Sequence, residues 1–119
     1  MQTVVETPPY LDAAKEAGLS EKELETIKDM LARNPIAGDL IVGTGGCRKV
    51  RVGGRGKGKS GGYRVITFFT GPNLPVFLIT VFGKGERSDL TQKERNALGD
   101  MTKLIVEGYR RKVAKLPRR

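Results

Sequence analysis

Residues 76–82 form an almost wholly apolar run, and this run limits the folds that the chain can adopt. Its β-branched and aromatic side chains favour a strand. A strand without alternating polar residues is covered on both faces, so we place it centrally in a sheet with packing partners above and below. The chain has 119 residues, which is room for one core. We therefore expect residues 1–119 to form a single domain.

The rest of the chain predicts an α+β fold with an antiparallel sheet of three to five strands, two N-terminal helices and one C-terminal helix. Ser20 and Glu23 have the spacing of a capping box at a helix start. Pro35 disfavours helical backbone angles at Asn34 and ends that helix. Segments rich in β-branched and aromatic residues between turn signals indicate strands. The expected helices cover residues 10–17, 20–34 and 91–109, and the expected strands cover 2–6, 39–42, 47–52, 63–69 and 76–82.

The last helix is expected to pack on the sheet. Thr91 and Glu94 have capping-box spacing. Apolar residues then recur at helical spacing and predict an amphipathic helix. These residues are Leu98, Met101, Leu104, Ile105 and Tyr109. We expect the basic tail, residues 110–119, to fray.

Positive charge is concentrated in the second part of the sequence. The chain has 22 Lys and Arg against 13 Asp and Glu, a net charge of +9. Residues 1–40 carry a net charge of −4 and residues 41–119 a net charge of +13, and no acid lies between Asp39 and Glu86. Such a basic face predicts a polyanionic partner, most often a nucleic acid. The alternative is a solvated surface that keeps a small protein soluble. The candidate RNA-binding residues are Arg48, Lys49, Arg51, Arg55 and Arg87.

Residues 53–60 match the phosphate-binding pattern G-x-x-x-x-G-K-S, but their context does not fit it. A phosphate-binding loop must lead into a helix N-terminus. Here Ser60 leads into Gly61-Gly62 and a strand-like segment. We therefore expect a Gly- and Lys-rich hairpin loop that can follow a phosphate backbone, and no nucleotide cofactor.

The residue inventory narrows the possible chemistry. The chain has no histidine and one cysteine, Cys47, which excludes an internal disulfide and histidine-based catalysis. The basic half has no cluster of carboxylates, so we expect no metal and no cofactor.

Cleavage of RNA remains possible with these residues, because RNA supplies its own nucleophile, the 2′-hydroxyl. Lysine with a pKa lowered by neighbouring cations can accept its proton. Arginine can hold the phosphate oxygens and stabilise the transition state.

Three ordered motifs resemble those of a known toxin family. Residues 43–51, Gly-Thr-Gly-Gly-Cys-Arg-Lys-Val-Arg, resemble the signature GTGGLRKIR of HigB-like toxins in the RelE/ParE superfamily. Residues 57–66 resemble the segment KGKRGGxRII, and residues 78–90 resemble LLTIYGKxExSDL. The similarity extends over about residues 20–108.

This resemblance implies a RelE-like fold and the toxin of a type II toxin–antitoxin system. It implies a ribosome-dependent endoribonuclease that cleaves translated mRNA, with a cognate antitoxin, the ribosome and mRNA as partners. By position, the catalytic candidates are Lys57, Lys59, Arg64 and Lys84. Family members with a second arginine after the Gly-Lys that follows the strand at 76–82 would place it at Gly85, and those with a downstream catalytic tyrosine would place it at Thr91. Lys84 or Arg87 can substitute for them.

Two other functions fit parts of the sequence. A ParE-type toxin would bind DNA gyrase and would not need converging Lys and Arg residues. A non-catalytic RNA-binding protein would use the basic loop without cutting RNA. In every case we expect a cytoplasmic protein that does not bind membranes, because no apolar run spans a bilayer and the N-terminus lacks the features of a signal peptide.

Overall fold

The computed structural model describes residues 1–54, 58–83 and 90–114, with the backbone alone at 54, 58–61 and 112–114. Eight helices and strands form within these ranges, in the order that the sequence predicts. They are β1 (Val4–Glu6), α1 (Pro8–Ala17), α2 (Glu21–Arg33), β2 (Asp39–Leu40), β3 (Cys47–Gly54), β4 (Gly58–Phe68), β5 (Val76–Gly83) and α3 (Gln92–Ala114).

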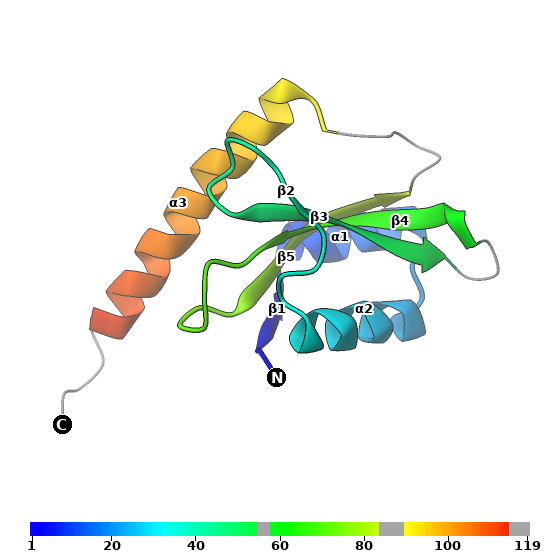
Figure 1. The fold of residues 1–119 in the computed structure, drawn as a ribbon, viewed down its shortest axis with the longest axis horizontal. Coiled ribbons are helices and arrows are strands. Elements are labelled where there is room, and N and C mark those ends of the chain that lie inside the picture. Colours follow the sequence, from blue (N-terminus) through cyan, green and yellow to red (C-terminus); the bar gives the residue numbers. More distant parts are fainter. Residues whose placement is uncertain (55–57, 84–89, 115–119) are drawn as a thin grey trace.

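The five strands form one sheet in the order β1-β5-β4-β3-β2 (Figure 1). The strands β2 to β5 pair antiparallel, as expected, while β1 adds a parallel pair beside β5. β5 is therefore an interior strand covered on both faces, as its apolar sequence predicts. The middle position is nevertheless taken by β4, because β1 extends the sheet on the far side of β5.

Two apolar clusters lie on opposite faces of the sheet, and different helices cover them (Figure 1). Residues of α1 and α2 pack on one face, which we call the α2 face. Residues of α3 pack on the other, which we call the α3 face. The cluster on the α2 face contains Tyr10, Ala14, Ile27, Leu31, Val50, Val65, Val76, Leu78 and Val81. The cluster on the α3 face contains Ile41, Cys47, Ile66, Phe68, Ile79, Phe82, Leu90 and Leu98.

Side-chain caps fix where the two N-terminal helices begin. The predicted capping box of α2 is confirmed: the amide of Glu23 donates to Ser20 Oγ at 3.1 Å, and the amide of Ser20 donates to Glu23 Oε1 at 2.9 Å. The cap of α1 is Thr7, which the sequence analysis missed. Its hydroxyl donates to the carbonyl of Leu78 at 2.7 Å, so the same side chain ties the start of α1 to β5.

The helix α3 begins with the predicted capping box, in which the amide of Thr91 donates to Glu94 Oε1 at 2.8 Å. Its predicted apolar stripe is wrong at Leu104, which is 69% exposed. The helix continues to Ala114, so it includes the first residues of the basic tail, and the expected fraying of residues 110–119 stays a prediction. Residues 115–119 of that tail lie outside the described residues. In the described part of the chain, no helix has the length and apolarity needed to cross a membrane.

A buried hydroxyl and a glycine hold α3 close to the loop before β3. Thr102 Oγ1 donates to the carbonyl of Thr44 at 2.8 Å, and the hydroxyl of Thr44 accepts from the amide of Cys47 at 3.1 Å. A Cβ at Gly99 would lie 3.0 Å from the carbonyl oxygen of Gly43, which explains a glycine within the helix. These contacts attach α3 to the start of β3.

The loop between α2 and β2 passes so close to β3 that it requires glycine at position 38. Gly38 has a φ of +89°, and a Cβ there would overlap the carbonyl of Lys49. Gly18 has a similar φ of +79°, but a Cβ there would meet open space.

We expect Gly18→Ala to lower the free energy of unfolding by about 1 kcal/mol, the cost of a left-handed backbone. We expect Gly38→Ala to lower it by at least about 3 kcal/mol, because the loop must also move off β3. Urea unfolding of both variants measures the difference, and equal losses would show that the close approach is unimportant.

Candidate nucleic-acid interface

The pairing of β3 with β4 brings basic residues onto one face of the sheet. In the register, Arg51 lies opposite Arg64, and Arg64 lies opposite Phe82 on β5. Side chains alternate between faces along a strand. Val50 and Val65 pack on the α2 face, so Arg51 and Arg64 lie on the α3 face. Lys49 is two residues from Arg51 and lies on the same face. We call Lys49, Arg51 and Arg64 the basic row.

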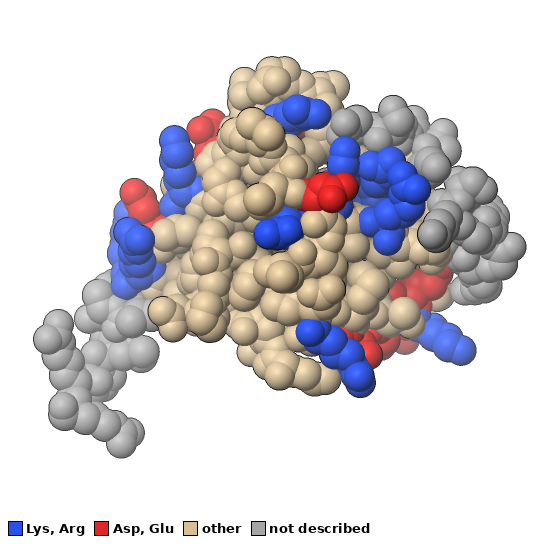
Figure 2. All heavy atoms as spheres, viewed as in Figure 1, with Lys and Arg blue, Asp and Glu red and all other residues tan. Residues whose placement is uncertain are grey.

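The basic row lies on a part of the sheet that α3 leaves accessible. Arg51 is exposed, and Lys49 and Arg64 are partly buried. Figure 2 shows Lys and Arg side chains gathered over the region where β3 and β4 pair. Like charges directly opposite each other in a sheet are destabilising. Arg51 and Arg64 lie opposite each other, and neither has an ion-pair partner among the described residues. Such an arrangement suits a bound anion.

Arg64 is the member of the basic row that the sheet holds in place most firmly. Its Nε atom is buried and has no hydrogen-bond partner within the described part of the chain. Residue 64 is on the central strand, whose backbone is held by neighbours on both sides. A rigid strand directs a side chain more accurately than a loop does. The guanidinium of Arg64 therefore has a buried N–H donor that is available to a ligand.

Arg48 does not belong to this surface, although the sequence analysis placed it among the RNA-binding residues. It lies one residue from Lys49 and so on the opposite face of β3. Its Nη1 atom donates to the carbonyls of Ile36 and Gly38, each at 3.1 Å. This side chain holds the loop before β2 against the sheet, and its expected contact with RNA stays a prediction.

The structure does not place the remaining predicted residues. Lys59 lies on β4, but only its backbone is described. The other residues fall outside the described ranges: Arg55, Lys57, Lys84, Gly85 and Arg87. Thr91, at the position of the family's tyrosine, caps α3 by accepting a hydrogen bond from the amide of Glu94.

The expectation about the phosphate-loop pattern is confirmed, because this segment runs from β3 into β4 and not into a helix.

Two side chains with possible chemical roles are buried. Phe82 is 3% exposed and belongs to the apolar cluster on the α3 face. Cys47 is also buried, and this burial raises the pKa of its thiol to about 11. The thiol is therefore protonated at neutral pH, which is its weakly nucleophilic form.

Comparison with known proteins decides the family. A family model described as the RelE toxin of the RelE/RelB toxin–antitoxin system matches residues 4–119. This chain belongs to the RelE toxin family. It is thus the toxin of a toxin–antitoxin system, and membership implies a cognate antitoxin as its partner. Among solved structures, a mutant of the toxin RelE from E. coli in the free state has a similar fold. The match has a TM-score of 0.54 at 20% identity and covers 85% of this chain and 96% of that one.

Substitutions on the two faces of β3 should change the free energy of unfolding of this RelE-family toxin in opposite directions. We expect Arg51→Thr to raise the free energy of unfolding by about 0.5 kcal/mol, because it removes the repulsion with Arg64. We expect Arg48→Thr to lower it by about 1 kcal/mol, because the carbonyls of residues 36 and 38 lose a charged donor.

Urea unfolding at low and at high salt measures both effects. The gain from Arg51→Thr should shrink as salt screens the repulsion. A loss of stability in Arg51→Thr as large as in Arg48→Thr would contradict the assignment of the two arginines to different faces.

Proposed function

We propose that this toxin is a ribosome-dependent endoribonuclease of the HigB-like type, which cleaves translated mRNA and so halts translation. The observation that carries this proposal is the position of Arg51 opposite Arg64 on an accessible face, with Lys49 beside them. Opposite residues of paired strands are about 5 Å apart at their Cα atoms. Two guanidinium groups at this spacing can reach one phosphate together.

The reaction we propose uses the nucleophile of the substrate. The 2′-hydroxyl loses its proton and its oxygen attacks the adjacent phosphorus, while the bond from phosphorus to the 5′-oxygen breaks. The 5′-oxygen then takes up a proton. The upstream fragment ends in a 2′,3′-cyclic phosphate and the downstream fragment in a 5′-hydroxyl. Because every bond change occurs within the RNA, the enzyme needs only to align the groups, stabilise charge and move protons.

The roles of individual residues follow from their side chains. We assign Arg64 to the non-bridging phosphate oxygens, because a guanidinium donates two parallel hydrogen bonds to them. Arg51 and Lys49 hold the adjacent backbone and add to the positive field. Lys57 or Lys59 accepts the proton of the 2′-hydroxyl, and Lys84 protonates the leaving oxygen. Arg55 and Arg87 contribute RNA contacts. These loop assignments rest on the family motifs.

The ribosome has a physical part in this mechanism. Several cations at short distance bind RNA tightly without fixing the angle of attack. A fixed codon supplies the alignment, and alignment is worth several kcal/mol of the barrier. A gyrase-binding function has less support, because it would leave the paired arginines without a role.

The substrate hydroxyl gives the sharpest test. We expect mRNA with a 2′-deoxy substitution at the scissile nucleotide to resist cleavage on translating ribosomes, because the nucleophile is absent. The same substitution at the next nucleotide is the control and should leave cleavage intact. End analysis should find a 2′,3′-cyclic phosphate and a 5′-hydroxyl. Equal cutting of the deoxy substrate, or a 5′-phosphate on the downstream fragment, would disprove the mechanism.

A further inference from the structure

A carboxylate lies at one end of the basic row. In the register of β2 and β3, Asp39 is opposite Lys49. Residues directly opposite each other share a face of the sheet, so Asp39 lies on the α3 face with the basic row. Ile41, two residues further along, belongs to the apolar cluster of the same face, in agreement with this assignment. Asp39 and Arg51 are both exposed, so one ligand can contact both.

The backbone that carries Asp39 is held in place. The carbonyl of Gly38 accepts a hydrogen bond from Arg48 Nη1 at 3.1 Å, and Gly38 lies so close to β3 that a Cβ there would overlap the carbonyl of Lys49. The side chain of Asp39 nevertheless forms no hydrogen bond or ion pair with another described residue. Its two carboxylate oxygens are therefore available to a ligand, and their position is defined by the sheet.

The distance from the arginine pair decides which part of RNA this carboxylate can meet. Strands lie about 4.8 Å apart and rise about 3.4 Å per residue, so the Cα atom of Asp39 is about 10 Å from the midpoint of Arg51 and Arg64. The short side chain of Asp39 does not reach the 2′-hydroxyl beside a phosphate held at that midpoint. Its negative charge also repels a second phosphate. A base of a neighbouring nucleotide is the part of RNA that remains.

A carboxylate distinguishes bases because it only accepts hydrogen bonds. Proteins read unstacked RNA bases through the donors and acceptors on their edges. Adenine, guanine and cytosine carry an exocyclic amino group that can donate, as in the contact of Asp or Glu with N4 of cytosine. Uracil has a carbonyl oxygen in place of this amino group, and that oxygen repels a carboxylate. Asp39 is therefore suited to separate amino-bearing bases from uracil.

We propose that Asp39 is a specificity-determining residue of this toxin, which accepts a hydrogen bond from the amino group of a base beside the scissile phosphate and so disfavours uracil there. The inference rests on the proposed function, in which Arg51 and Arg64 hold that phosphate. Contacts to phosphate position a nucleic acid but carry no sequence information. The basic row would thus place the RNA strand, while Asp39 reads one of its bases.

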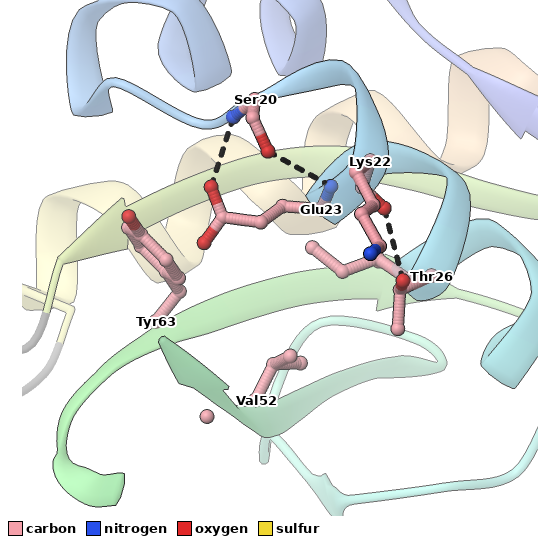
Figure 3. Close-up of a pocket in the computed structure, with 8 residues that line it drawn as sticks. Ser20, Lys22, Glu23, Thr26, Val52 and Tyr63 are labelled. Atoms are coloured by element: carbon pink, nitrogen blue, oxygen red, sulfur yellow. Dashed lines mark hydrogen bonds between the residues drawn. The ribbon is translucent and has the colours of Figure 1, made fainter. Parts of the chain in front are cut away.

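The carboxylate of Glu23 also lies near these strands, but on the other face of the sheet. It borders a cavity of about 460 Å³ that Val52 and Tyr63 line from the α2 face. Figure 3 shows Glu23 of α2 and Tyr63 of β4 facing this cavity. Glu23 Oε1 accepts a hydrogen bond from the amide of Ser20 at 2.9 Å. A base in this cavity would be separated from the basic row by the sheet, so Glu23 does not compete for the role of Asp39.

Cytosine and uracil test the proposal, because they have nearly the same shape and differ in the exocyclic group. We expect kcat/KM on translating ribosomes to be higher with cytosine than with uracil at one nucleotide flanking the cleavage site. Asp39→Asn has one donor and one acceptor and can bond to either base. The cytosine-to-uracil ratio of the wild type should therefore exceed that of Asp39→Asn at least about fivefold, the lower end for one good base contact. Effects of the ribosome itself cancel in this comparison.

Asp12→Asn is the matched control, because Asp12 is an exposed acid on α1 and its loss changes the net charge equally. This variant should keep the ratio of the wild type. The same ratio in the wild type and Asp39→Asn at every flanking position, or an equal change in Asp12→Asn, would overturn this inference alone. Complete loss of cleavage by folded Asp39→Asn would also overturn it, by assigning Asp39 to the chemistry. A wild type that cleaves no translated mRNA would instead contradict the proposed function, and this inference with it.

Discussion

The antiparallel pairing of β3 with β4 is the contact on which the candidate site depends. Valines at positions 50 and 65 pack against the N-terminal helices, and this packing sets the faces of both strands. A shift of one residue in the register would move these valines to the other face. The same register therefore directs Arg51 and Arg64 to the α3 face. The apolar core thus determines where the basic row lies, although no member of the row belongs to the core.

The attachment of α3 leaves this row accessible. Leu98, Met101 and Ile105 pack on the apolar cluster of the α3 face, and Thr102 bonds to the loop that leads into β3. The helix covers the apolar part of the sheet and leaves Arg51 exposed. The repulsion between two adjacent arginines reduces stability slightly when the site is empty. A bound phosphate converts that repulsion into two favourable contacts, so the same arrangement favours anion binding.

Local signals predicted much of the fold, and non-local contacts account for what was missed. The capping boxes at Ser20 and Thr91 act within one helical turn, so sequence spacing suffices to find them. The structural role of Arg48 depends on a loop ten and twelve residues earlier in the chain, and no spacing rule reveals that contact. The basic row has a weak local signal, because Lys49 and Arg51 share a face by alternation. Their partner Arg64 becomes evident only from the register. The loop lysines 57 and 59 stay a prediction.

The central claim is that Arg51 and Arg64 act on one phosphate, and a double-mutant cycle on mRNA cleavage tests it most directly. We expect Arg64→Ala to lower kcat/KM on translating ribosomes by about a hundredfold or more, as for the loss of an oxyanion donor. Arg51→Ala should lower it less. Because both side chains share one anion, the effects of the two single variants on the activation free energy should not add in the double variant. The coupling free energy of the cycle should be at least about 1 kcal/mol. Strictly multiplicative effects, or full activity in Arg64→Ala, would contradict the account.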